Sequence, residues 1–389
     1  MSYTETTYTS WFARIKSALT GALVGLVLLI GCIWLLIWNE GRAIQTYRAL
    51  SEGASQVISV DGVAVDPANE GKLVHISGAV KSDQVPQDSQ FGITADGAVG
   101  LSREVEMYQW VEKSESQTKK TLGGGEETTT TYSYTREWSP DVVDSSRFKQ
   151  PDDHQNPTGM PDGATFTAKT AHVGVFSVPG KDMAGIGYSS RLALADSDVQ
   201  RIGAEIGAGR PAKRNAEGAY IGLNENLPAI GDLRIIYHRI DVETASVVGK
   251  QNHSALVPYE TTNHRDIFLT AAGDVDASRM FKSAESENNI ITWLVRVAGL
   301  IGLFISFKLM FGLLPILGDL IPFIGTVIGF GTSIAAFVLT LLIGPVVIAI
   351  AWFAYRPLLA IGIIAGGILL ALAVSRLRRK APLSQPQPT

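Results

Sequence analysis

A hydrophobic block covers residues 290–375 and constrains the whole chain, because a segment so apolar cannot remain in water. Within it, the run from Pro322 to Tyr355 has no charged side chain over 34 residues. One helix needs only about 20 residues to cross a hydrocarbon core of roughly 30 Å. The block therefore predicts several spans, which we assign to residues 292–310, 333–354 and 357–374.

The segment between the first two of these spans, residues 311–331, carries helix-breaking and polar residues. These residues are Pro315, Gly318, Asp319 and, near the end of the segment, Pro322. Irregular backbone at membrane depth is tolerated only where it packs on protein or lines a cavity. We therefore expect a broken, interfacial or re-entrant segment at this point.

A further span is predicted near the N-terminus, over residues 17–38, which are uncharged and follow Arg14 and Lys16. A signal peptide has a shorter apolar region and a small-residue cleavage site. This run instead ends in Trp34 and Trp38, and tryptophan favours the membrane interface. We interpret the segment as an uncleaved anchor.

The placement of positive charge predicts the topology of the chain. The tail, residues 376–389, is rich in proline and starts with a basic cluster, and basic residues close to a span favour the cytoplasmic side. With four spans, residues 1–16 are cytoplasmic too, and residues 39–289 lie outside the cytoplasm or in a lumen. Residues 39–289 then face the periplasm, the lumen of the ER or the exterior of the cell.

The large region of residues 39–289 is acidic, with 24 lysines and arginines against 35 aspartates and glutamates, a net charge of −11. Such a surface is a poor match for nucleic acid. The apolar spans make the lipid bilayer an expected partner. The only cysteine, Cys32, lies inside the first span, so this region folds without a disulfide.

The acidic region has the pattern of a mainly β domain, with one predicted helix over residues 189–206. Two β-prone runs flank Gly123, Gly124 and Gly125, which predicts a long hairpin. We expect strands over residues 73–80, 103–115, 128–138, 165–177, 232–242 and 245–258. Pro67 to Val80 and Pro228 to Ile240 are similar in sequence, which favours a duplicated β-unit.

Aromatic and basic residues gather on single faces of the two hairpin strands. Tyr108 and Trp110 share a face of the first, and Tyr134, Arg136 and Trp138 share a face of the second, by the period of two. Packing within the sheet through cross-strand pairs is one interpretation. An outward binding surface is the other.

No pattern of catalytic or metal-ligating residues stands out. The six histidines have no zinc-ligand spacing, and there is neither a phosphate-binding loop nor a nucleophile elbow. Glu104, Glu106 and Glu112 together with Glu70 are the best carboxylate candidates, but alternate acids on a strand are usually its solvated face. We therefore expect no enzyme activity, no metal and no cofactor.

Several motifs are distributed from the first span to the last. They are Asn39-Glu40-Gly41-Arg42-Ala43, Glu70-Gly71-Lys72-Leu73-Val74-His75-Ile76, the stretch Glu104 to Glu112 around Tyr108 and Trp110, Tyr132-Ser133-Tyr134 with Glu137-Trp138, Asn156-Pro157, Gly231-Asp232-Leu233-Arg234, Trp293 with Arg296, and Tyr355-Arg356-Pro357-Leu358. Together they resemble the transmembrane protein 43 family, also called LUMA. On this resemblance Glu70, Asp232, Arg234 and Arg296 are added to the aromatic residues as interaction or structural candidates.

The resemblance implies a four-span protein with a large lumenal domain. Animal members are expected in the ER and inner nuclear membrane, where they self-associate and help to organise membrane protein complexes that include lamins and emerin. The Thr/Gly-rich hairpin loop and the Pro/Gln-rich tail distinguish this chain from them, and together with its high Ala and Gly content they favour a bacterial relative. Such a relative would lie in the bacterial inner membrane and would have no lamin or emerin to bind.

Arg296 is expected near the start of its span. It can extend toward the membrane surface or pair with an acidic residue such as Glu285 or Glu287.

Small residues recur at four-residue spacing within two predicted spans, and such residues let helices approach closely in lipid. They are Gly21 and Gly25 in the first span and Gly362 and Gly366 in the last. The pattern fits packing within one chain or association between copies.

The sequence thus predicts an α+β membrane protein with four transmembrane helices and a large β-rich extracytoplasmic domain. The function that fits best is a multi-pass scaffold that organises or regulates membrane protein complexes. Lipid or ligand binding is the main alternative, and a channel or an enzyme fits less well, because the spans carry few polar residues and no catalytic set is visible.

Overall fold

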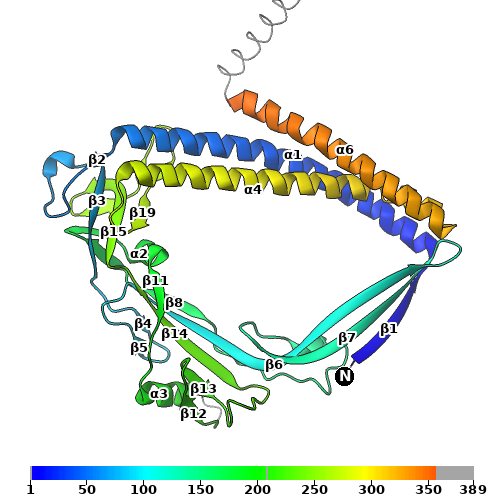
Figure 1. The fold of residues 1–389 in the computed structure, drawn as a ribbon, viewed down its shortest axis with the longest axis horizontal. Coiled ribbons are helices and arrows are strands. Elements are labelled where there is room, and N and C mark those ends of the chain that lie inside the picture. The colour runs from blue at the N-terminus through cyan, green and yellow to red at the C-terminus, as the bar shows by residue number, and fades with distance from the viewer. Residues whose placement is uncertain (1, 207–208, 356–389) are drawn as a thin grey trace, which may run out of the picture. The chain divides into compact units, whose positions relative to one another are not determined.

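The computed structural model describes residues 2–206 and 209–355, and these residues form two compact units (Figure 1). The β-rich unit contains Met1–Thr9, Arg48–Thr121 and Glu126–Glu287. The membrane unit contains Ser10–Tyr47, Leu122–Gly125 and residues 288–355. The predicted span of residues 357–374, the tail of residues 376–389, Gly362 and Gly366 lie outside the described residues.

Three helices in the described part of the chain are long and apolar enough to cross a membrane. These are α1 (Trp11–Gln56), the segment that begins with α4 (Ala277–Phe311), and α6 (Pro322–Tyr355). Three of the four predicted spans fall inside these helices. The predicted break is also present: α4 ends at Phe311, α5 (Leu313–Gly318) is short, and Pro322 begins α6. Proline suits this first helical position because its missing N–H group would have no partner there.

Helices α1 and α4 run antiparallel in close contact within the membrane unit. The apolar core between the helices contains Cys32, Leu36, Leu303 and Phe307. A Cβ atom added to Gly25 would lie 2.8 Å from the carbonyl oxygen of Ser306, closer than any side chain allows. Gly21 lies beside Leu309 on the same face. Gly21 and Gly25 therefore lie on the face of α1 that packs against α4 of the same chain.

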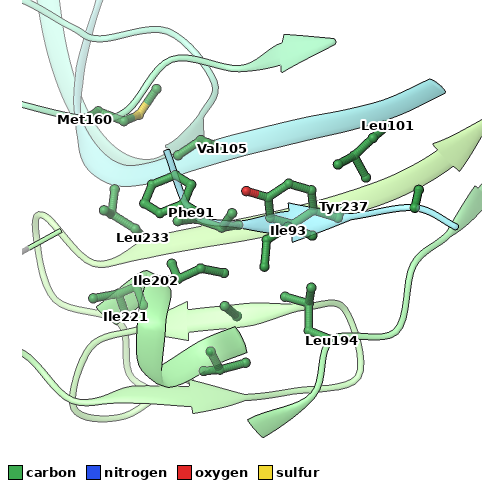
Figure 2. Packing of buried hydrophobic residues seen from close by; sticks show 14 of the residues in the cluster. Phe91, Ile93, Leu101, Val105, Met160, Leu194, Ile202, Ile221, Leu233 and Tyr237 are labelled. Atoms are coloured by element: carbon green, nitrogen blue, oxygen red, sulfur yellow. The ribbon is translucent and has the colours of Figure 1, made fainter. Parts of the chain in front are cut away.

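The first sheet of the β-rich unit has eight strands in the order β1-β7-β6-β14-β13-β12, with β8 paired to β6 and β11 paired to β14. Its core, partly shown in Figure 2, includes Phe91, Leu101, Ile202 and Tyr237. The strands are β1 (Ser2–Thr9), β6 (Gly100–Lys120), β7 (Glu126–Ser139), β8 (Ala164–Thr167), β11 (Tyr188–Arg191), β12 (Ala212–Arg214), β13 (Ala219–Ile221) and β14 (Leu233–Asp241).

The second sheet has seven strands in the order β19-β15-β16-β10-β9-β3-β2, with β15 also paired to β3. Its core includes Val74, Val173, Phe176 and Val247, and α2 (Gly180–Ile186) contributes Met183. The strands are β2 (Ile58–Ser59), β3 (Leu73–Ser82), β9 (Thr170–Val173), β10 (Phe176–Pro179), β15 (Thr244–Asn252), β16 (Ala255–Val257) and β19 (Leu269–Ala272). Two small hairpins, β4 (Gln87–Asp88) with β5 (Ile93–Thr94) and β17 (Tyr259–Glu260) with β18 (Asp266–Ile267), complete the unit.

The helix predicted over residues 189–206 is shorter in the structure. Residues 188–191 pair with β14 as β11, and α3 (Asp196–Ile206) begins only afterwards. Asp196 and Asp198 therefore lie in the first turn, where a carboxylate interacts favourably with the helix dipole. Asp198 also accepts a hydrogen bond of 3.0 Å from the backbone N–H of Ala195.

Two further predictions changed in detail. The single strand expected over residues 165–177 is three short strands, separated by turns that include Gly174 at φ +61°. The two halves of the predicted duplication begin alike. Gly71 and Gly231 have positive φ angles of +77° and +89°. Two residues after each glycine a strand starts at a leucine, β3 in the first half and β14 in the second. These strands belong to different sheets, and the duplication stays a prediction.

Candidate functional site

A polar cluster joins α1 to α4 inside the membrane unit. On α4 its members are four residues apart, which places them on one face of the helix. The cluster consists of Asn39, Glu40 and Arg42 from α1 and Asn288, Thr292 and Arg296 from α4.

The centre of the cluster is an ion pair between Arg296 and Glu40. The guanidinium donates from Nε and Nη2 to the two carboxylate oxygens at 2.7 and 2.8 Å. Glu40 is only 2% exposed, and the guanidinium also lies 4.9 Å from the ring centre of Trp293. Such a bidentate, charge-assisted pair is among the stronger hydrogen-bonded contacts in proteins.

The predicted partners of Arg296, Glu285 and Glu287, are therefore wrong. Both lie on α4 itself, nine or more residues before Arg296, which corresponds to about 13 Å or more along the helix axis. The Glu40 carboxylate of the neighbouring helix α1 lies directly beside Arg296. Arg296 therefore has no need to extend toward the membrane surface.

The other half of the cluster is held by amide and hydroxyl groups. Arg42 donates to Asn288 Oδ1 and Thr292 Oγ1, each at 3.0 Å. Asn39 donates to the carbonyl of Thr292 at 3.1 Å, and Asn288 donates to the carbonyl of Ala43 at 3.0 Å. Each bond runs from one helix to the other, so the cluster fixes the register of α1 against α4.

The end of α6 reaches the same place. A Cβ atom added to Gly41 would lie 2.6 Å from the ring of Tyr355, so this ring packs directly on the glycine and a larger residue would displace it. The cavity beside Glu40, Tyr47 and Trp352 has a volume of about 90 Å³. Pockets for organic ligands usually measure about 300–1,000 Å³. Asn39, Trp293 and Tyr355, which belong to three different motifs of the sequence, thus lie close together where the helices join.

A second contact in the membrane unit attaches the tip of the β6–β7 hairpin, residues 122–125, to the start of α1. Arg14 donates to Asp319 Oδ2 at 2.6 Å and also to the carbonyl of Gly124. Gly123 donates to the carbonyl of Leu320 at 3.3 Å. Asp319, from the predicted broken segment, is fully buried and neutralised by Arg14.

This contact bears on the topology. The charge pattern predicts residues 1–16 and the Gly123 loop on opposite sides of the membrane. A hydrogen bond between Arg14 and Gly124 requires both to be on the same side. Arg14 contributes its charge to Asp319, so it is a poor indicator of orientation.

The hairpin aromatics form cross-strand pairs. The register sets Tyr108 opposite Trp138 and Trp110 opposite Arg136. The rings of the first pair are 5.3 Å apart, and the Arg136 guanidinium is 5.3 Å from the ring of Trp110. Arg234 of β14 lies 4.0 Å above the ring of Trp138. These contacts favour the packing interpretation.

The loop that follows β7 covers the remaining aromatic residue. Tyr134 is 6% exposed and stacks on His154 at 3.8 Å. Its hydroxyl donates to Glu112 at 2.8 Å, and burial together with this carboxylate raises the pKa of Tyr134 to about 12. Asn156 accepts from the N–H of Trp110 and donates to its carbonyl, at 2.7 and 2.9 Å, as a neighbouring strand would.

The acidic candidates hold loops in place. Glu70 accepts from the backbone N–H of His253 at 2.9 Å. Asp232, which is buried, accepts from Tyr220 Oη at 2.6 Å and from the N–H of Ala229 at 2.9 Å. Over residues 2–206 and 209–355 no group of acids, histidines or cysteine has the arrangement of a metal site.

Sequence reasoning missed Glu40, Asn288 and Thr292 as parts of a site. A signal was present, because Asn288, Thr292 and Arg296 form a polar stripe at four-residue spacing on an otherwise apolar helix. The partner residues on α1 belong to the motif Asn39-Glu40-Gly41-Arg42-Ala43, which contributed only to the family resemblance.

Comparisons with known proteins agree on one family. A family model described as Transmembrane protein 43 matches residues 107–357. Transmembrane protein 43 of Mus musculus is 31% identical over 379 residues, covering 94% of this chain and 92% of that protein. The Homo sapiens protein is 30% identical with the same coverage, and a Drosophila melanogaster homolog is 28% identical. No solved structure matches, and none of these names is that of an enzyme.

Proposed function

Because this chain belongs to the transmembrane protein 43 family, we propose that it is a multi-pass scaffold that self-associates and organises or regulates other membrane proteins. The observation that carries the proposal is the Arg296–Glu40 pair and the polar cluster around it. Arg296 lies within the span predicted over residues 292–310, and an ionisable residue inside a membrane span is costly. Its pairing with Glu40 joins α1 and α4 into one fixed platform.

A channel or transporter would use such residues differently. It needs polar groups that face a water-filled path and exchange partners with the transported solute. Glu40 and Arg296 bind each other through two hydrogen bonds, and the cavity beside them, at about 90 Å³, is smaller than pockets that hold small-molecule ligands. This arrangement favours a structural role for the cluster.

Lipid binding is a second candidate, supported by a cavity of about 390 Å³ beside the start of α4. Phe268, Leu269 and Met280 give it an apolar lining, and Arg279 and Glu287 give it charge. Its volume lies within the range of ligand pockets. An amphipathic molecule with a short acyl chain matches this combination.

The scaffold proposal is tested by extracting the full chain from its membrane directly into polymer-bounded nanodiscs and measuring the particle mass. We expect particles with several copies of the chain. Particles with a single copy at every protein density would overturn self-association. The lipid-binding candidate is tested with Met280→Trp, whose larger side chain fills the cavity. A lipid that co-purifies in a fixed ratio with the wild-type protein but not with this variant would favour lipid binding.

A further inference from the structure

One part of the first sheet extends beyond its core as a three-stranded ribbon. The ribbon consists of β1, residues 113–120 of β6 and residues 126–133 of β7. The two outer strands begin and end opposite the same residues of β7, an alignment that we call flush register. Ser2 and Lys113 both lie opposite Ser133, and Thr9 and Lys120 both lie opposite Glu126. The two outer strands therefore have equal length, and both run antiparallel to β7, so they point the same way.

The ribbon has no buried face of its own. Every residue of β1 except Glu5 is exposed, and so are residues 113–119 of β6. Threonine and serine dominate, with cross-strand hydroxyl contacts such as Ser116 to Thr130 at 2.9 Å. A small sheet that faces water on both sides is only marginally stable by itself. Further partners would therefore stabilise it.

Both outer edges of the ribbon lack a strand partner among the residues that the structure describes. Strand β1 pairs only with β7, and β6 pairs only with β7 beyond Met107. Unpaired strand edges bind other strands readily through backbone hydrogen bonds. Neither edge contains proline, which would block such pairing.

Charge distinguishes the possible pairings. Residues 113–120 carry three lysines and Glu115, a net charge of +2, whereas β1 carries only Glu5. Two β6 edges would repel each other, because like charges on neighbouring strands are destabilising. A β6 edge beside a β1 edge in flush register places no two like charges opposite each other, because Glu5 faces Ser116. Glu5 already pairs with Lys149 at 2.8 Å and Lys113 with Glu137 at 3.1 Å, so this pairing is selected by the absence of repulsion.

We propose that the free β1 edge of one copy pairs in parallel with the free β6 edge of a second copy, so that the ribbons join into one continuous sheet. The proposal rests on the self-association proposed above and names its surface. Each copy uses two different edges, so the contact is head to tail. Repetition of such a contact closes a ring or extends a filament.

Engineered disulfides test this pairing. Thr6 and Gln117 both lie opposite Thr129, so in one copy they are two strand spacings apart, about 9.6 Å. This separation exceeds the reach of a disulfide, whereas one strand spacing of about 4.8 Å between copies does not. In a Cys32→Ala background, the Thr6→Cys/Gln117→Cys protein in nanodiscs should form reducible dimers and larger products under mild oxidation.

The controls separate the possible outcomes. Each single cysteine variant, and Thr7→Cys with Gln117→Cys, which point to opposite faces, should cross-link at least five-fold less. Multi-copy particles without cross-links in the double variant would overturn the edge pairing and leave the scaffold function standing. Disulfide-linked dimers of the Thr6→Cys single variant would overturn the pairing of β1 with β6 and would indicate that the β1 edges of two copies pair with each other. Single-copy particles would overturn both proposals.

Discussion

Arg296 and Glu40 are 256 residues apart in the sequence, yet they form a bidentate ion pair between α4 and α1. A buried pair of this kind contributes little net stability compared with apolar residues, but loss of one partner leaves an uncompensated charge. The pair therefore makes the packing of the two helices specific, and each member depends on the other.

Replacing Arg296 by leucine should destabilise the protein by roughly 3–5 kcal/mol, because the Glu40 carboxylate loses its counter-charge. The Glu40→Leu/Arg296→Leu protein should recover most of this loss. Thermal unfolding in nanodiscs, followed by tryptophan fluorescence, compares the three proteins. A single variant as stable as wild type would show that the pair has no structural role.

Gly25→Leu should disrupt the contact between α1 and α4, because its Cβ atom would meet the Ser306 carbonyl and the Leu309 side chain. Gly31→Leu is the matched control, since nothing lies within 4 Å of a Cβ atom at that position of the same helix. We expect faster proteolysis and a lower melting temperature for Gly25→Leu alone. Equal behaviour of the two variants would contradict the packing described here.

The N-terminus and the hairpin tip should be labelled from the same side of the membrane, because Arg14 binds Gly124. In a Cys32→Ala background, Ser2→Cys and Leu122→Cys both give exposed thiols. A membrane-impermeant maleimide applied to sealed vesicles should modify either both or neither. Labelling of only one would rule out the contact.

Stability should fall between about pH 10 and pH 12, partly because Tyr134 ionises. The folded state raises the pKa of Tyr134 to about 12, above about 10 for a free tyrosine, so the folded state retains the proton longer. The contribution of Tyr134 to the free energy of unfolding is complete below about pH 10 and is lost as the pH rises through about 12. Tyr134→Phe should reduce the slope of melting temperature against pH in this window, and an unchanged slope would refute the assignment.

The sequence was sufficient for features that depend on local pattern. Hydropathy located three spans within α1, α4 and α6, and the glycine run located the hairpin, whose aromatic pairs follow from the period of two. Features that depend on distant partners were not predictable. Residues 2–9 form a strand only because residues 126–133 offer an edge, and Glu40 becomes a site only because Arg296 faces it.

The pairing of β1 with β7 also sets an order of events during synthesis. The first strand leaves the ribosome about 120 residues before its partner. At about 5–20 residues per second, it waits roughly 6–24 s without a partner, while α1 has already been made. The insertion machinery must therefore fix the orientation of α1 before the sheet that includes its N-terminal extension exists.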